Sequence, residues 1–166
     1  MRIYIGGVGG VGKTAISKEF IKNHKEFKHL PGSEIMMTAC EVNSRKELSE
    51  LDLEYKLEIE NTKYVEVVKE HPFLIVDGHC RLTKAQADCF DIFVYMVANA
   101  ETIKQRRKEK GRRNCSGIEA DIKEYNKRVE NLKTQHDIKI HKLKNEGITE
   151  YAVKSLENLI KGYTES

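Results

Sequence analysis

A glycine-rich segment near the N-terminus, GVGGVGKT, matches the pattern G-x-x-x-x-G-K-[ST]. A polyphosphate must lie against backbone N–H groups, and glycines let the backbone adopt positive φ angles and approach it closely. Lys13 is expected to reach the β- and γ-phosphates, and the Thr14 hydroxyl to bind Mg2+. The sequence therefore predicts a site for ATP with Mg2+, formed by Gly7, Val8, Gly9, Gly10, Val11, Gly12, Lys13, Thr14 and Ala15.

The segments on both sides of this loop support that interpretation. Residues 2–6 alternate with an apolar bias and predict a strand, and residues 14–27 carry Ile16, Phe20 and Phe27 at helical spacing. A helix that begins at the loop directs its positive dipole end at the bound anion. A glycine-rich turn that binds nothing is the alternative, and this strand–loop–helix context disfavours it. The motif leaves the reaction open, because GTPases, ATPase motors and small-molecule kinases share it.

An aspartate follows the short apolar run FLIV at residues 73–76, which is typical of a buried parallel strand. Ligands of open α/β sheets bind at the carboxyl ends of the strands. We therefore expect Asp77 to act on Mg2+, directly or through a water molecule. The alternative is that Asp77 caps the next helix.

Arginine is concentrated in one stretch of a chain that otherwise prefers lysine, with 21 lysines to 8 arginines. Arginine binds phosphate with a bidentate fork, whereas lysine offers a point charge. The stretch therefore predicts phosphate binding, and a solvated basic helix face is the alternative. Its five arginines are Arg106, Arg107, Arg112, Arg113 and Arg128.

The segment DGHCRLTKAQAD, residues 77–88, resembles the DGFPRTxxQA segment of adenylate kinases, with one extra residue before the glutamine. The resemblance implies that Arg81 holds the phosphate of an acceptor nucleoside monophosphate and that Gln86 reads its adenine. His79 and Cys80 depart from the aromatic residue and the proline of that family. The DGH triplet is similar to archaeal-type adenylate kinases and to those linked to ribosome maturation. His79 is then either a residue that supports ATP hydrolysis or a hydrogen-bonded histidine at a strand end.

The same resemblance extends to an acceptor-binding region at residues 28–70 and to a short lid at residues 104–116. It implies that Ser33 and Met36 line the acceptor base or ribose. Arg45 is a candidate second contact to the acceptor phosphate, with a solvated helix arginine as the alternative. The lid resemblance implies that Arg107, Arg113 and Arg128 contact phosphates, with Arg106 and Arg112 as neighbours that could substitute. The lid region at residues 104–116 is too short for a large folded lid or a zinc-bearing lid.

The remaining pattern predicts alternating strands and helices, hence parallel βαβ units. We expect one domain, residues 1–166, with a three-layer α/β/α P-loop NTPase fold, a five-stranded parallel sheet and a short lid. The further expected elements are a strand in 28–32, a helix or strand in 34–40, one or two helices in 45–70, a strand at 91–97, a helix at 101–110, a helix at 116–134 capped by Ser116 and Glu119, a further helix in 135–146 ending at Gly147, a strand in 148–153 and a helix at 153–162.

The composition sets limits on the class of protein. The 166 residues are 39% hydrophobic and 33% charged, which indicates a globular chain, and the apolar runs are too short to predict a membrane span. A net charge of +3 does not imply nucleic acid. The start of the chain predicts no signal peptide, and four cysteines without a CxxC pair favour free thiols, so a cytoplasmic location is expected.

These observations predict a nucleotide kinase that uses ATP and Mg2+ to phosphorylate a nucleoside monophosphate, with AMP the first candidate. The alternatives are an ATPase or ribosome-assembly factor of the same fold, which would have a ribosomal partner, and a kinase of another small phosphorylated acceptor. The resemblance also allows a homo-oligomer. A GTPase switch is disfavoured, because the string nearest to its guanine motif, NKRV at 126–129, lacks the aspartate.

Overall fold

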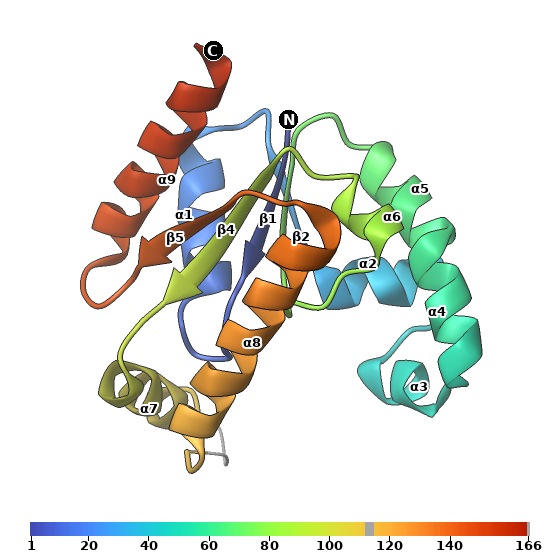
Figure 1. The fold of residues 1–166 in the computed structure, drawn as a ribbon, viewed down its shortest axis with the longest axis horizontal. Helices are drawn as coiled ribbons and strands as arrows, with labels where there is room; N and C mark the ends of the chain where they lie inside the picture. The colour runs from blue at the N-terminus through green and yellow to red at the C-terminus, as the bar shows by residue number, and fades with distance from the viewer. Residues whose placement is uncertain (112–114, 166) are drawn as a thin grey trace.

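The computed structural model describes residues 1–111 and 115–165, and in them five parallel strands form one sheet in the order β2-β3-β1-β4-β5 (Figure 1). No helix in this part of the chain is long and apolar enough to cross a membrane. The strands are β1 (Arg2–Gly6), β2 (Lys28–Pro31), β3 (Leu74–Gly78), β4 (Ile92–Val97) and β5 (Ile140–Lys144). The helices are α1 (Lys13–Asn23), α2 (Gly32–Ala39), α3 (Arg45–Glu50), α4 (Leu53–Asn61), α5 (Lys63–Lys69), α6 (Lys84–Ala87), α7 (Ala100–Glu109), α8 (Ile118–His136) and α9 (Thr149–Thr164).

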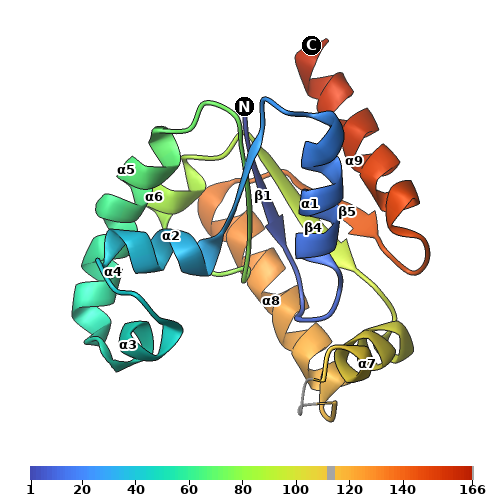
Figure 2. The same ribbon diagram turned by 180° about the vertical axis from the view of Figure 1, so that it is seen from behind.

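Helices cover both faces of the sheet. Successive residues of a strand point to opposite faces, so Ile3 and Ile75 pack under α1 and α9, whereas Tyr4 and Val76 pack on the other face. α1 and α9 lie side by side on the first face, and α8 crosses the second (Figures 1 and 2). Burial from both sides explains why the central strands are almost entirely apolar. The predicted three-layer fold with five parallel strands is confirmed.

The C-terminal part of the chain differs from the prediction. Strand β5 lies within residues 135–146, where a helix was expected, and residues 148–153 begin α9 instead of forming a strand. β5 pairs with β4 at the edge of the sheet, and its only buried side chain is Leu143, so its charged composition hid the strand. In α9 the buried residues Ala152, Val153 and Leu156 follow the helical repeat. The segment 148–153 alone is too short to reveal that repeat.

Two further elements depend on local capping. The predicted cap of Ser116 and Glu119 is wrong, because α8 begins after Gly117, which has a left-handed φ of 71°. Residues 45–70 form three helices, since the Asp52 side chain accepts hydrogen bonds from the backbone N–H groups of Glu54 and Tyr55 and so starts α4 separately from α3. Residues 34–40, undecided from sequence, lie largely in the helix α2.

Candidate functional site

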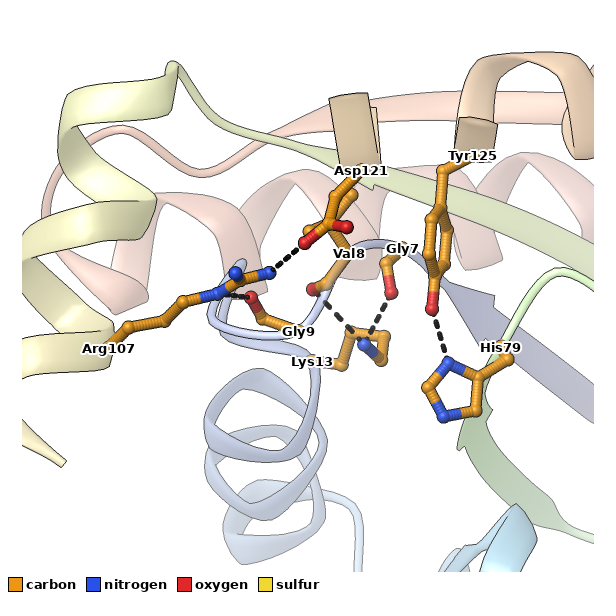
Figure 3. A network of polar contacts seen from close by, with 8 residues as sticks. All are labelled: Gly7, Val8, Gly9, Lys13, His79, Arg107, Asp121 and Tyr125. Atoms are coloured by element: carbon orange, nitrogen blue, oxygen red, sulfur yellow. Dashed lines mark hydrogen bonds and ion pairs between the residues drawn. The ribbon is translucent and has the colours of Figure 1, made fainter. Parts of the chain in front are cut away.

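The phosphate loop connects β1 to α1 at the carboxyl end of the sheet. Gly12, which precedes α1, has a φ of 101°, and a Cβ atom there would overlap Asn145 Nδ2. Glycine adopts this conformation without strain, and larger residues do not. Lys13 Nζ donates to the carbonyl oxygens of Gly7 at 2.6 Å and Val8 at 3.3 Å (Figure 3). The loop thus gathers the first N–H groups of α1 and an ammonium group at one place, as a polyphosphate site requires.

Asp77 lies beside this loop at the end of β3. Thr14 Oγ1 donates a hydrogen bond to Asp77 Oδ2, and His29 Nε2 lies 3.1 Å from Asp77 Oδ1. Burial by itself would raise the pKa of Asp77. The hydrogen bonds from His29 and Thr14 and the charge of Lys13 outweigh burial, so the pKa is lowered. Asp77 is therefore an anion at neutral pH.

Thr14 and Asp77 fit the predicted magnesium site. Mg2+ prefers hard oxygen ligands, and in nucleotide sites it is held by one or two protein oxygens together with phosphate oxygens and water. The hydroxyl of Thr14 and the carboxylate of Asp77 are in direct contact next to the phosphate loop. Both oxygens would therefore be available to one ion that arrives with a nucleotide.

An open cleft of about 1070 Å³ extends from the phosphate loop to α3 and α4. Lys13, Thr14 and Asp77 lie on its phosphate-loop side. Besides Lys13, four basic side chains line it, against the two acidic residues Glu34 and Asp77. In the part of the chain that the structure describes, none of these four forms an ion pair. They are Lys18, Arg45, Lys56 and Lys110. The cleft is therefore cationic and suited to anionic ligands.

The residues predicted to bind the acceptor separate into two groups. Ser33 and Arg45 line the cleft, where Arg45 Nη2 donates to Ser33 Oγ at 3.0 Å. Met36 packs against the apolar clusters beneath α2. Arg81 is exposed after β3 and is not among the residues that line the cleft. Gln86 is buried in α6, where its side-chain oxygen accepts from the N–H of the N-cap residue Thr83 in a capping box.

Two of the predicted lid arginines contact the backbone of the phosphate loop. Arg107 is buried, donates from Nε to Gly9 O at 2.8 Å and pairs with Asp121 at 2.7 Å (Figure 3). Arg106 donates to Val11 O at 3.1 Å. Arg128 pairs with Glu124 and covers the Tyr125 ring. Arg112 and Arg113 lie outside the described residues. In this structure Arg106 and Arg107 hold the loop in place through its carbonyl groups.

Three cleft residues outside the predicted set come from the helices and strand around it. Lys18 lies one helical turn after Thr14 on α1, a spacing that could have indicated it from sequence. Lys56 on α4 and His29 on β2 carry no comparable signal, because they reach the cleft only through the packing of their elements.

His79 connects the cleft to α8. Its Nδ1 atom contacts the Tyr125 hydroxyl (Figure 3). His79 also lines the cleft. Burial lowers the pKa of His79, and the charges of Lys13, Arg128, Arg81 and Arg45 lower it further. His79 is consequently a neutral hydrogen-bonding group at neutral pH.

The lowered pKa of His79 predicts a pH-dependent stability. Near pH 6 the unfolded chain binds more protons at this position than the folded chain, so the folded state should become more stable as pH rises toward the ordinary value of 6.5 and above. We expect urea unfolding to show a loss of stability between pH 7.5 and 5.5, and His79→Gln to show a smaller loss. Equal losses in both proteins would contradict this.

The fold and the site together define a domain with the P-loop NTPase fold. A family model described as an AAA domain (AAA_17) matches residues 6–124, which is more than half of the chain, and the chain belongs to this family. A search of curated proteins finds no match.

Solved structures of the same fold include three kinases. A shikimate kinase from Acinetobacter baumannii in complex with shikimate has a TM-score of 0.67 and 16% identity, covering 97% of this chain and 93% of that chain. A shikimate kinase from Bacteroides thetaiotaomicron has a TM-score of 0.70 and 15% identity, covering 97% and 98%. A gluconokinase from Sinorhizobium meliloti 1021 has a TM-score of 0.63 and 11% identity, covering 99% and 97%. At these identities the likeness establishes the fold.

Proposed function

We propose that this protein transfers the γ-phosphoryl group of ATP to an anionic small molecule, and that the acceptor is a nucleoside monophosphate, with AMP the first candidate. The observation that carries the proposal is that one cleft joins the two parts of the site. It has the phosphate loop at one side and, at the other, cations that form no ion pair with any residue the structure describes, Arg45 and Lys56 among them. A donor triphosphate and an anionic acceptor would thus share one site.

The chemistry asked of this site is mainly positioning and charge stabilisation. Lys13 and the first N–H groups of α1 would stabilise the donor phosphates. Bound Mg2+, held by Thr14 and Asp77, would neutralise charge on the phosphate oxygens. Arg45 would orient the acceptor. A monophosphate oxygen is already an anion near neutral pH, so no general base is required.

The adenylate kinase resemblance supports the nucleoside monophosphate as acceptor, through the segment from Asp77 to Asp88. Two of the structural relatives are named for shikimate and one as a gluconokinase, which keeps other small anions in the test. The acceptor is tested by incubating the protein with ATP, Mg2+ and a panel containing AMP, CMP, UMP, GMP, shikimate and gluconate. Phosphorylation of AMP or another monophosphate would support the proposal. If ADP forms at the same rate whether or not an acceptor is present, the protein is instead an ATPase, and His79 is then the first residue to examine.

Arg45 and Arg81 are the two candidate contacts to the acceptor phosphate, and substitution distinguishes between them. We expect Arg45→Ala to raise the acceptor KM about tenfold to a hundredfold, because one charge-assisted contact contributes about 1.5–3 kcal/mol, while the KM for ATP stays nearly constant. Initial rates at varied acceptor and ATP concentrations give both constants. Lys46→Ala, its exposed neighbour on α3, is the control. If Arg81→Ala raises the acceptor KM and Arg45→Ala does not, the assignment passes to Arg81.

A further inference from the structure

His29 is on β2, the strand next to the one that carries Asp77, and its side chain contacts the Asp77 carboxylate. In the parallel pairing of β2 with β3, His29 is opposite Ile75 and Pro31 is opposite Asp77. Opposite residues share a face of the sheet, so His29 and Asp77 both point toward α1. Their side chains are only 4% and 6% exposed, and His29 Nε2 lies 3.1 Å from Asp77 Oδ1.

The two oxygens of the Asp77 carboxylate have different partners. Thr14 contacts Oδ2, and His29 contacts Oδ1. A carboxylate with one oxygen fixed cannot rotate freely, so the position of the other oxygen is fixed as well. We propose that His29 is a positioning residue that holds the Asp77 carboxylate toward Thr14 and so sets the affinity of the phosphate loop for a divalent cation–nucleotide complex.

The surroundings of His29 favour this role over simple core packing. Its neighbours on the same face include the aliphatic core residue Ile75, and an aliphatic side chain at position 29 would avoid the cost of burying a polar ring. A hydrogen bond to an ionised carboxylate is about twice as strong as one between neutral groups, which offsets that cost. Groups that orient a metal-binding side chain in this way typically change metal affinity by about 10–100-fold when removed.

The inference rests on the proposed function in one respect, namely that a magnesium nucleotide binds at the phosphate loop; it does not depend on the acceptor. The experiment therefore measures binding without turnover. Mn2+ replaces Mg2+ as a paramagnetic probe, and its binding in the presence of ADP is followed by electron paramagnetic resonance. Metal-free ADP binding is measured separately, by calorimetry in EDTA. The variants are His29→Leu, His29→Asn and His29→Gln. The glutamine amide nitrogen can reach the place of Nε2, and the asparagine amide is too short.

We expect His29→Leu and His29→Asn to weaken Mn2+ binding in the presence of ADP about tenfold or more. His29→Gln should stay within about threefold of wild type, and metal-free ADP binding should change little in all three. Should His29→Leu fail to fold, the comparison of asparagine with glutamine decides. Two results overturn the role of His29 and leave the proposed function intact. One is an equal Mn2+ affinity in wild type and His29→Asn. The other is a parallel fall in the affinity for Mn2+ with ADP and in the affinity for ADP without metal. A wild-type protein that binds neither form of ADP overturns the proposed function itself.

Discussion

Replacing Lys13 by alanine is expected to lower kcat for phosphoryl transfer about a thousandfold, which corresponds to about 4 kcal/mol of transition-state stabilisation. The ammonium group lies inside the phosphate loop, within hydrogen-bonding distance of the Gly7 and Val8 carbonyl oxygens. Negative charge shifts between the phosphate oxygens during transfer, and a fixed positive charge there acts with little screening by water. Steady-state rates with the acceptor identified by the panel provide the measurement.

The effect of Lys13→Ala should be confined to the site. Lys22 is on the same helix but is exposed and pairs with Glu19, so Lys22→Ala is the matched control and should keep full activity. Thermal unfolding should show that the Lys13 variant retains its fold. A folded Lys13→Ala protein with wild-type kcat would refute the assignment of the phosphate loop.

Replacing Asp77 by asparagine is expected to lower kcat about a hundredfold at a moderate Mg2+ concentration and to raise the Mg2+ concentration needed for half-maximal rate. The substitution keeps the shape of the side chain but removes the negative charge that would hold the ion next to Thr14. Rates measured over a range of Mg2+ concentrations separate the loss of metal affinity from a loss of catalysis. An Asp77→Asn protein with an unchanged Mg2+ dependence would remove Asp77 from the metal site.

The control for this prediction is Asp88→Asn, an exposed aspartate that pairs with Lys84 on α6 and should leave the rate unchanged. Stability offers a second measurement. Because the pKa of Asp77 is lowered from its ordinary 3.8, its ionised form stabilises the fold above that pH, and this stabilisation is lost as the carboxylate is protonated on acidification. The asparagine variant should lose less stability than wild type as the pH falls through that region.

The sequence determined the phosphate loop and its immediate surroundings because the residues involved are consecutive. The glycines, Lys13 and Thr14 occupy one loop between a strand and a helix, and the local conformation alone brings them together. The apolar run before Asp77 likewise placed a carboxylate at the end of a buried strand, and ends of parallel strands meet at one edge of the sheet. These features require no knowledge of how distant elements pack.

Only the tertiary structure decided which residues complete the cleft. His29 reaches Asp77, 48 positions away in the chain, through the pairing of two strands. Lys56 lines the same cleft because α4 packs against α2, α5 and α6. The edge strand β5 was missed for the same reason, since it is defined by hydrogen bonds to β4 and by a single buried residue rather than by composition. Local patterns fix what a segment prefers, whereas strand register and helix packing fix which side chains meet, and those are properties of the whole chain.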